Sequence, residues 1–141
     1  ARSVCGEAPL ACDAVKAARS VAKRVILASN PLFPRVATEN RMSWVGLSPS
    51  DFDWITDYSN SGFCKPNPEY YKDILERFSL DPARCIMIGN DVQEDLAAAS
   101  TCGIEVFIVD DHIINRTGEE ISCKHGTYGE MINFLNSLKN A

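Results

Sequence analysis

The chain alternates continuous apolar runs with segments of helical periodicity. Val25 to Ala28 and Cys85 to Ile88 are apolar runs, and Ile104 to Val109 is apolar except for Glu105, a composition that is typical of strands covered on both faces. Ala11 to Arg24 and Tyr70 to Phe78 instead repeat apolar residues at three and four positions, the spacing of a helix. Because such strands alternate with helices, the pattern predicts an α/β fold with a parallel, Rossmann-like sheet and helices on both faces.

The segments between these runs continue the alternation. Asp53 to Asp57 predicts a short strand, and Arg35 to Val45 and Val92 to Thr101 predict helices. Thr127 and Glu130 have the spacing of a capping box that opens a last helix. The long polar stretch at 110–126 is expected to be an ordered surface loop.

Composition narrows the class of protein. The chain of 141 residues is 45% hydrophobic and 23% charged, which is typical of one globular core. No apolar run approaches the roughly 20 residues of a membrane helix, so a membrane partner is not expected. The net charge is −5, from 14 basic and 19 acidic residues, and the basic residues are scattered rather than clustered. We therefore expect no nucleic-acid partner.

The cysteines indicate neither zinc nor redox chemistry. Six cysteines contain no C-x-x-C pair and no histidine at ligand spacing, so reduced thiols are expected. Asn115-Arg116-Thr117 matches a glycosylation acceptor, but no secretory signal is recognisable at the N-terminus. These patterns predict a cytoplasmic protein.

Polar candidates stand where the apolar runs end. Ser29 and Asn30 follow the first run, Lys65 precedes the tyrosine-rich helix, and Asp91 and Asp95 follow the run at 85–88. Ligands of parallel sheets bind beyond the carboxyl ends of the strands. A hydroxyl, an ammonium group and carboxylates are the groups that hold a phosphoryl group beside Mg²⁺.

Each candidate also has an ordinary structural explanation. A serine after a strand often serves as a turn or cap residue, and a lysine before proline is usually solvated. Carboxylates at 91 and 95 would also suit a helix N-terminus, because the helix dipole favours negative charge there. The joint occurrence of these groups in this order favours an active site over separate structural roles.

In this order the residues resemble the haloacid dehalogenase (HAD) superfamily. Ser29 is similar to the second of its four motifs, Lys65 to the third, and Gly89 to Asp95 to the acidic fourth, over about residues 9 to 110. The resemblance implies that Ser29, Asn30 and Lys65 bind the phosphoryl group of a small substrate. It further implies that Asp91 binds Mg²⁺ and that Asp95 orients the waters on the metal.

The family's first motif is not found in this sequence. That motif is a D-x-D pair whose first aspartate attacks phosphorus, whereas Asp51-Phe52-Asp53 comes after the second motif instead of before it. The resemblance therefore implies a sheet that is incomplete without its central nucleophile strand, supplied by a missing N-terminal segment or a partner chain. Residues 1–8 are then expected to be a tail or linker from a missing cap, and 9–141 a partial HAD-like core.

The expected function is Mg²⁺-dependent phosphohydrolysis through an aspartyl-phosphate intermediate. The isolated chain is expected to be inactive because it lacks the nucleophile. Two alternatives remain open: a catalytically silent HAD-like protein with a binding or assembly role, and a metal-independent dehalogenase.

Overall fold

The computed structural model describes residues 8–140, which form two compact units. One unit contains the chain up to Asn60 together with the segment from Ile132 onward, and the other contains Ser61–Met131. Residues 1–7 of the expected tail lie outside the described part. Every strand pairing in both units is parallel, so the predicted α/β class with parallel strands is confirmed. Among residues 8–140, no helix is both long and apolar enough to span a bilayer.

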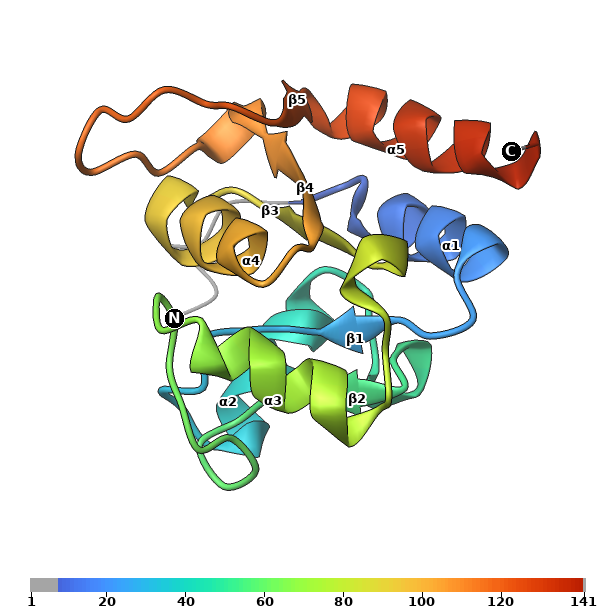
Figure 1. The fold of residues 1–141 in the computed structure, drawn as a ribbon. Coiled ribbons are helices and arrows are strands. Elements are labelled where there is room, and N and C mark those ends of the chain that lie inside the picture. The colour runs from blue at the N-terminus through green and yellow to red at the C-terminus, as the bar shows by residue number, and fades with distance from the viewer. Residues whose placement is uncertain (1–7, 141) are drawn as a thin grey trace. The chain divides into compact units, whose positions relative to one another are not determined.

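The first unit contains a two-stranded parallel sheet. Its elements in chain order are α1 (Ala11–Val21), β1 (Ile26–Leu27), α2 (Arg35–Trp44) and β2 (Trp54–Ile55). Ile26 pairs with Trp54 and Leu27 with Ile55, so α2 lies on the crossover between two parallel strands (Figure 1). The predicted strands and helices at these positions are confirmed, with ends that differ by up to three residues.

The second unit contains a three-stranded parallel sheet in the order β3-β4-β5. Its elements are α3 (Glu69–Arg77), β3 (Ile86–Gly89), α4 (Ala98–Thr101), β4 (Glu105–Val109) and β5 (Lys124–Gly126). The last helix, α5 (Tyr128–Ser137), begins in this unit and ends in the first. The capping box that opens it is present: Glu130 Oε2 accepts the Thr127 N–H, and Thr127 Oγ1 accepts the Glu130 N–H.

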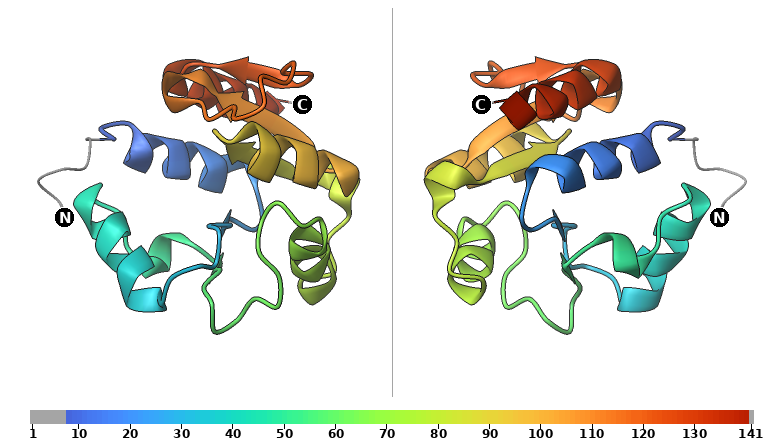
Figure 2. Two further views of the ribbon diagram at one scale, coloured as in Figure 1. Left: turned by 90° about the vertical axis from the view of Figure 1, so that its left-hand side faces the viewer. Right: turned by 90° about the vertical axis from the view of Figure 1, so that its right-hand side faces the viewer.

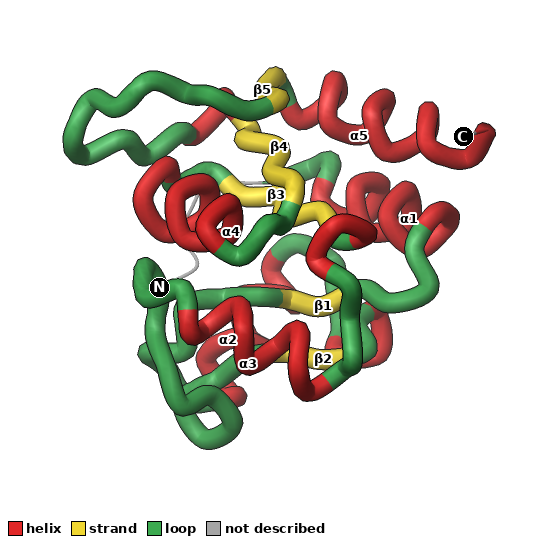
Figure 3. The backbone as a smooth tube through the Cα atoms, viewed as in Figure 1, coloured by secondary structure: helices red, strands yellow, loops and turns green. Residues whose placement is uncertain are grey.

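Strand β5 lies in a stretch that the sequence predicted to be a surface loop, and that prediction is wrong for this part. The stretch at 110–126 is not loop throughout, because Asp110–His112 forms a 3-10 helix and the last three residues pair with β4, so only the part between them runs as loop (Figure 3). Lys124 and His125 are exposed, so this strand carries no apolar run and no alternation that would reveal it.

The predicted helix from Val92 to Thr101 is present, but its first turns are wider than an α-helix. Val92–Ala97 is a π-helix, in which the Leu96 N–H donates to the Asp91 carbonyl five residues back, at 3.2 Å. Single π-turns of this kind are frequent at functional sites. The helix from 92 to 101 runs along one face of β3 and β4 (Figure 2).

The core of the second unit lies between this helix and β4. Val106 to Val109 are buried, and Val92, Leu96 and Ala99 of the helix are buried as well. In contrast, the apolar residues of β1 and β3 are only half-buried, although the sequence predicted strands covered on both faces. Within residues 8–140 each of these two strands has a strand partner on one side only, which explains the difference.

Candidate phosphoryl-transfer site

Lys65 and Asp95 form a buried ion pair in the second unit. Lys65 Nζ lies 2.6 Å from Asp95 Oδ1, and the two side chains are only 5% and 8% exposed. A buried lysine is costly unless it is paired and hydrogen-bonded. The two residues that the sequence placed in separate motifs are thus direct partners, and Asp95 fixes where the ammonium group lies.

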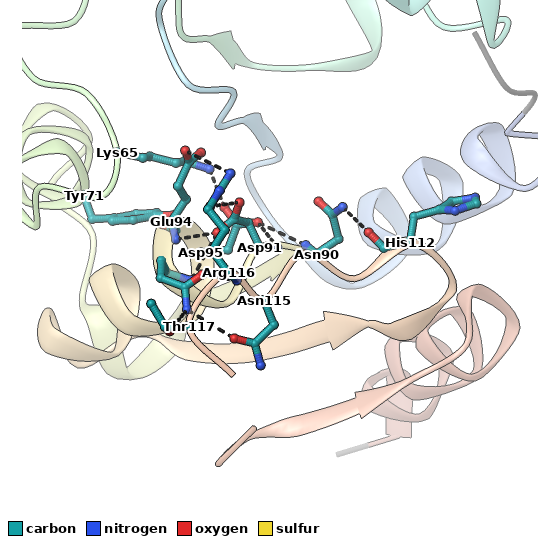
Figure 4. A network of polar contacts seen from close by, with 11 residues as sticks. Lys65, Tyr71, Asn90, Asp91, Glu94, Asp95, His112, Asn115, Arg116 and Thr117 are labelled. Carbon is teal, nitrogen blue, oxygen red and sulfur yellow. Dashed lines mark hydrogen bonds and ion pairs between the residues drawn. The ribbon is translucent and has the colours of Figure 1, made fainter. Parts of the chain in front are cut away.

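The other oxygen of Asp95 binds the turn after β3. Asp95 Oδ2 accepts the N–H groups of Asn90 at 3.0 Å and Asp91 at 3.1 Å. This approach requires a glycine at 89, because a Cβ there would lie 2.1 Å from Asp95 Oδ2. Asp95 therefore joins the end of β3, the helix that follows and Lys65 into one rigid group (Figure 4).

Two tyrosines of α3 surround the lysine. The Lys65 ammonium lies 5.5 Å from the ring centre of Tyr70 and 5.6 Å from that of Tyr71, within the range of cation–π attraction. The Tyr71 hydroxyl donates to the Glu94 carbonyl at 3.1 Å. Burial, and then the charge of Asp95, raise the pKa of Tyr71, so this residue stays neutral. Both tyrosines are buried, so they belong to the core of the unit and also line the lysine.

Asp91 divides its two oxygens between the helix and a cation. Oδ1 accepts the N–H groups of Gln93 at 3.1 Å and Glu94 at 2.9 Å, which caps the helix N-terminus. Oδ2 lies 2.7 Å from Nη1 of Arg116, and the Asp91 side chain is 7% exposed. The structure therefore brings Lys65, Asp91 and Asp95 together, as the motif order predicted.

Arg116 was not identified as a site residue from the sequence. It lies in the loop between β4 and β5, where the sequence showed only a glycosylation pattern, and no spacing rule links it to Asp91. The loop returns to the site because Ile114 forms a bridge with Asp91: the Val92 N–H donates to the Ile114 carbonyl and the Ile114 N–H to the Asn90 carbonyl.

Ser29 and Asn30 belong to the first unit, directly after β1. Both are half-buried, and the Thr56 hydroxyl donates a hydrogen bond of 2.6 Å to the Ser29 carbonyl. Next to Thr56, Asp57 is buried, and its pKa is lowered chiefly by the hydrogen bond from the Ser59 hydroxyl. The grouping of Ser29 and Asn30 with Lys65 and Asp91 stays a prediction.

The two carboxylates of the D-x-D segment at 51–53 are engaged in structural contacts. Asp51 closes a capping box with Ser48. Asp53 accepts the Val25 N–H at 2.7 Å and pairs with Arg19, and these contacts, the Val25 hydrogen bond first, lower its pKa. Each carboxylate thus has structural partners within the first unit.

The donors present fit a magnesium ion only in part. Among residues 8–140 there is no cluster of three or more histidine, cysteine or acidic residues that could hold a metal. Asp91 Oδ2 is nevertheless a buried carboxylate oxygen that already faces a cation, Arg116. Mg²⁺ commonly keeps several waters and uses one or two carboxylates plus the phosphate of the substrate, so Asp91 fits the role of one such ligand.

Comparison with known proteins identifies the family. A family model described as "Hydrolase: haloacid dehalogenase-like hydrolase" matches residues 6–103. The chain therefore belongs to the haloacid dehalogenase-like hydrolases.

Among sequence relatives, the glyceraldehyde 3-phosphate phosphatase of Methanothermobacter thermautotrophicus is 27% identical over 88 residues. That match covers 62% of this chain but only 38% of the relative, so the chain spans well under half of that phosphatase.

Solved structures share the fold. The HAD-hydrolase YfnB from Bacillus subtilis, bound to magnesium, has a TM-score of 0.72 at 19% identity, covering 90% of this chain and 55% of that one. The L-2-haloacid dehalogenase RSc1362 has a TM-score of 0.71 at 15% identity, with 91% and 56% covered. Because a magnesium-bound HAD-hydrolase and a dehalogenase match equally well, the fold alone does not select between phosphate-ester hydrolysis and dehalogenation.

Proposed function

We propose that this chain carries part of the active site of a Mg²⁺-dependent phosphohydrolase that acts on a small phosphorylated substrate. The main support for the proposal is the buried pair of Lys65 and Asp95 beside Asp91. It places the Lys65 ammonium group in the same cluster as Asp91, whose carboxylate faces the Arg116 guanidinium. The phosphatase relative supports phosphoryl chemistry.

The proposed roles follow from these contacts. Lys65 would neutralise charge that develops on the phosphoryl oxygens, a contribution that grows in the transition state. Asp95 would hold Lys65 in place, and its predicted second role, orienting the waters of the metal, stays part of the proposal. Ser29 and Asn30 would donate hydrogen bonds to the substrate. Asp91 would bind Mg²⁺, which supplies a positive charge beside the phosphoryl group when bound.

The nucleophile is proposed to come from outside this chain, with an aspartyl-phosphate as the intermediate. Asp51 is engaged in a capping box and Asp53 in an ion pair with Arg19, which supports this assignment. The half-buried strands β1 and β3, each with one strand partner within residues 8–140, are also what an absent neighbouring strand would leave. The 141-residue chain alone is accordingly expected to show no turnover.

Two other functions would use the same fold. A dehalogenase would work without metal, and a catalytically silent relative would keep the fold for binding or assembly. The similarity to a phosphatase favours the phosphohydrolase over both.

An assay of the protein as encoded by its gene separates the three functions. We expect hydrolysis of phosphate monoesters with Mg²⁺, loss of that activity in EDTA, and no halide release from 2-haloacids. Halide release that persists in EDTA would instead identify a dehalogenase. A folded protein with neither activity would support the silent alternative.

A further inference from the structure

Arg116 pairs with Asp91 through the carboxylate oxygen that is proposed to bind the metal. The proposed function gives Arg116 no role. Its Nη1 lies 2.7 Å from Asp91 Oδ2, and its Nη2 lies 3.9 Å from Glu94 Oε1. The Arg116 side chain is 54% exposed, whereas the Asp91 side chain is 7% exposed. A guanidinium with this exposure can move into water without opening the core, but the carboxylate cannot follow it.

The backbone of Arg116 is anchored independently of its guanidinium group. Gln93 Oε1 accepts the Arg116 N–H at 3.2 Å, and Gln93 Nε2 donates to Thr117 Oγ1 at 2.7 Å. On the other side, Asn115 Nδ2 donates to the Glu119 carbonyl at 2.8 Å. The side chain can therefore leave Asp91 while the loop keeps its place on the helix (Figure 4).

We propose that Arg116 is a built-in competitor of Mg²⁺ for Asp91. Without metal, Arg116 neutralises Asp91 Oδ2. When the metal binds, the guanidinium gives up that oxygen, because two cations at one carboxylate oxygen repel each other. This inference rests on the proposed function, since it takes Asp91 as the metal ligand.

The consequence is a coupling between the loop and the metal. Metal binding breaks the Arg116–Asp91 ion pair, so the free energy of that pair is subtracted from the free energy of Mg²⁺ binding. The pair therefore lowers the apparent affinity for Mg²⁺ by the factor that corresponds to its own free energy. Removing the guanidinium should therefore tighten metal binding, the reverse of what the loss of a supporting residue would do.

Isothermal titration calorimetry with Mg²⁺ tests the inference on the protein as encoded by its gene. For Arg116→Ala we expect a Kd roughly three- to tenfold lower than for wild type, the range for a half-exposed ion pair with one buried partner. Lys124→Ala is the matched control: it removes one positive charge from the same unit, where Lys124 pairs with Glu105, and should change the Kd less than about twofold. Asp91→Asn should bind Mg²⁺ far more weakly than wild type.

A second measurement follows the guanidinium directly. In wild type, Mg²⁺ should move the Nε–Hε NMR resonance of Arg116 toward that of a free arginine side chain. Unchanged or weaker Mg²⁺ binding in Arg116→Ala, with Asp91→Asn still abolishing it, would overturn the competition and leave the proposed function standing. Tightening by Lys124→Ala as large as that by Arg116→Ala would also overturn it. If wild type and Arg116→Ala both fail to bind Mg²⁺, the metal-dependent function falls as well.

Discussion

At the scale of single residues, the ammonium group of Lys65 is fixed from several sides. Asp95 pairs with it, and the rings of Tyr70 and Tyr71 face it. The sequence predicted a lysine at the site but not its partners, because the contact joins residues 30 apart, and spacing rules describe neighbours within one helix or strand. Arg116 was not predicted as a site residue for the same reason.

Replacing Lys65 should slow the chemical step. We expect Lys65→Met in the complete protein to lower kcat on the order of 10²–10³-fold, because it removes charge stabilisation that grows in the transition state. Steady-state kinetics with a phosphate ester measures the loss, and thermal unfolding confirms that the variant is folded. Lys72→Met, at an exposed lysine paired with Glu69 on α3, is the control and should retain wild-type kcat. An unchanged kcat in Lys65→Met would make Lys65 a structural residue.

Asp57 should make stability depend on acid pH. Its hydrogen bond from Ser59 lowers its pKa in the folded protein below the unfolded value of about 3.9, so its contribution is complete above that value and is lost as pH falls through the folded pKa. Asp57→Asn should therefore reduce the free energy of unfolding at pH 7 by up to about 3 kcal/mol. The difference in the free energy of unfolding between wild type and variant should shrink below about pH 4. Urea unfolding between pH 7 and 3 measures it, and a gap that stays constant over this range would contradict the assignment.

At the scale of elements, the turn from β3 into its following helix determines the site. Asp91 caps the helix, the first turns are π-helical, and Asp95 reaches back to the N–H groups of Asn90 and Asp91. The alanine-rich pattern predicted the helix but not its π-helical first turns. Apolar periodicity indicates which face of a helix is buried, but it does not indicate which carbonyl accepts each N–H. In the same way, β5 was missed because its pairing with β4 leaves no apolar signature.

Gly89 is the position where this turn is most sensitive. A Cβ at 89 would lie 2.1 Å from Asp95 Oδ2 and 2.7 Å from Asp95 Cβ. Because Lys65 and two N–H groups hold that carboxylate, Gly89→Ala should destabilise the fold by about 1–3 kcal/mol and displace Lys65. Gly62→Ala, at a glycine of the same unit whose Cβ would meet no atom within 4 Å, is the control. Equal free energies of unfolding for the two variants would show that the turn relaxes around the methyl group.

At the scale of the whole molecule, the order of elements followed from the sequence with little error. The alternation of apolar runs and helical periods is a property of whole segments, so it survives errors of a few residues at each end. The arrangement of charges did not follow, since it depends on where the loop at 113–123 returns to the site. The family and the fold agree with each other, whereas the roles of Lys65, Asp91 and Asp95 in phosphoryl transfer are proposed.

The dependence of phosphate-ester hydrolysis on Mg²⁺ in the complete protein, compared between wild type and Asp91→Asn, shows whether Asp91 is the metal ligand of a phosphohydrolase. Wild-type activity should rise with Mg²⁺ to saturation. Asp91→Asn should need at least about tenfold more Mg²⁺ for half-maximal activity, since even the partners of metal ligands act on that scale, and part of its lost activity should return at high metal. Identical rates and identical Mg²⁺ dependence in the two proteins would contradict the account.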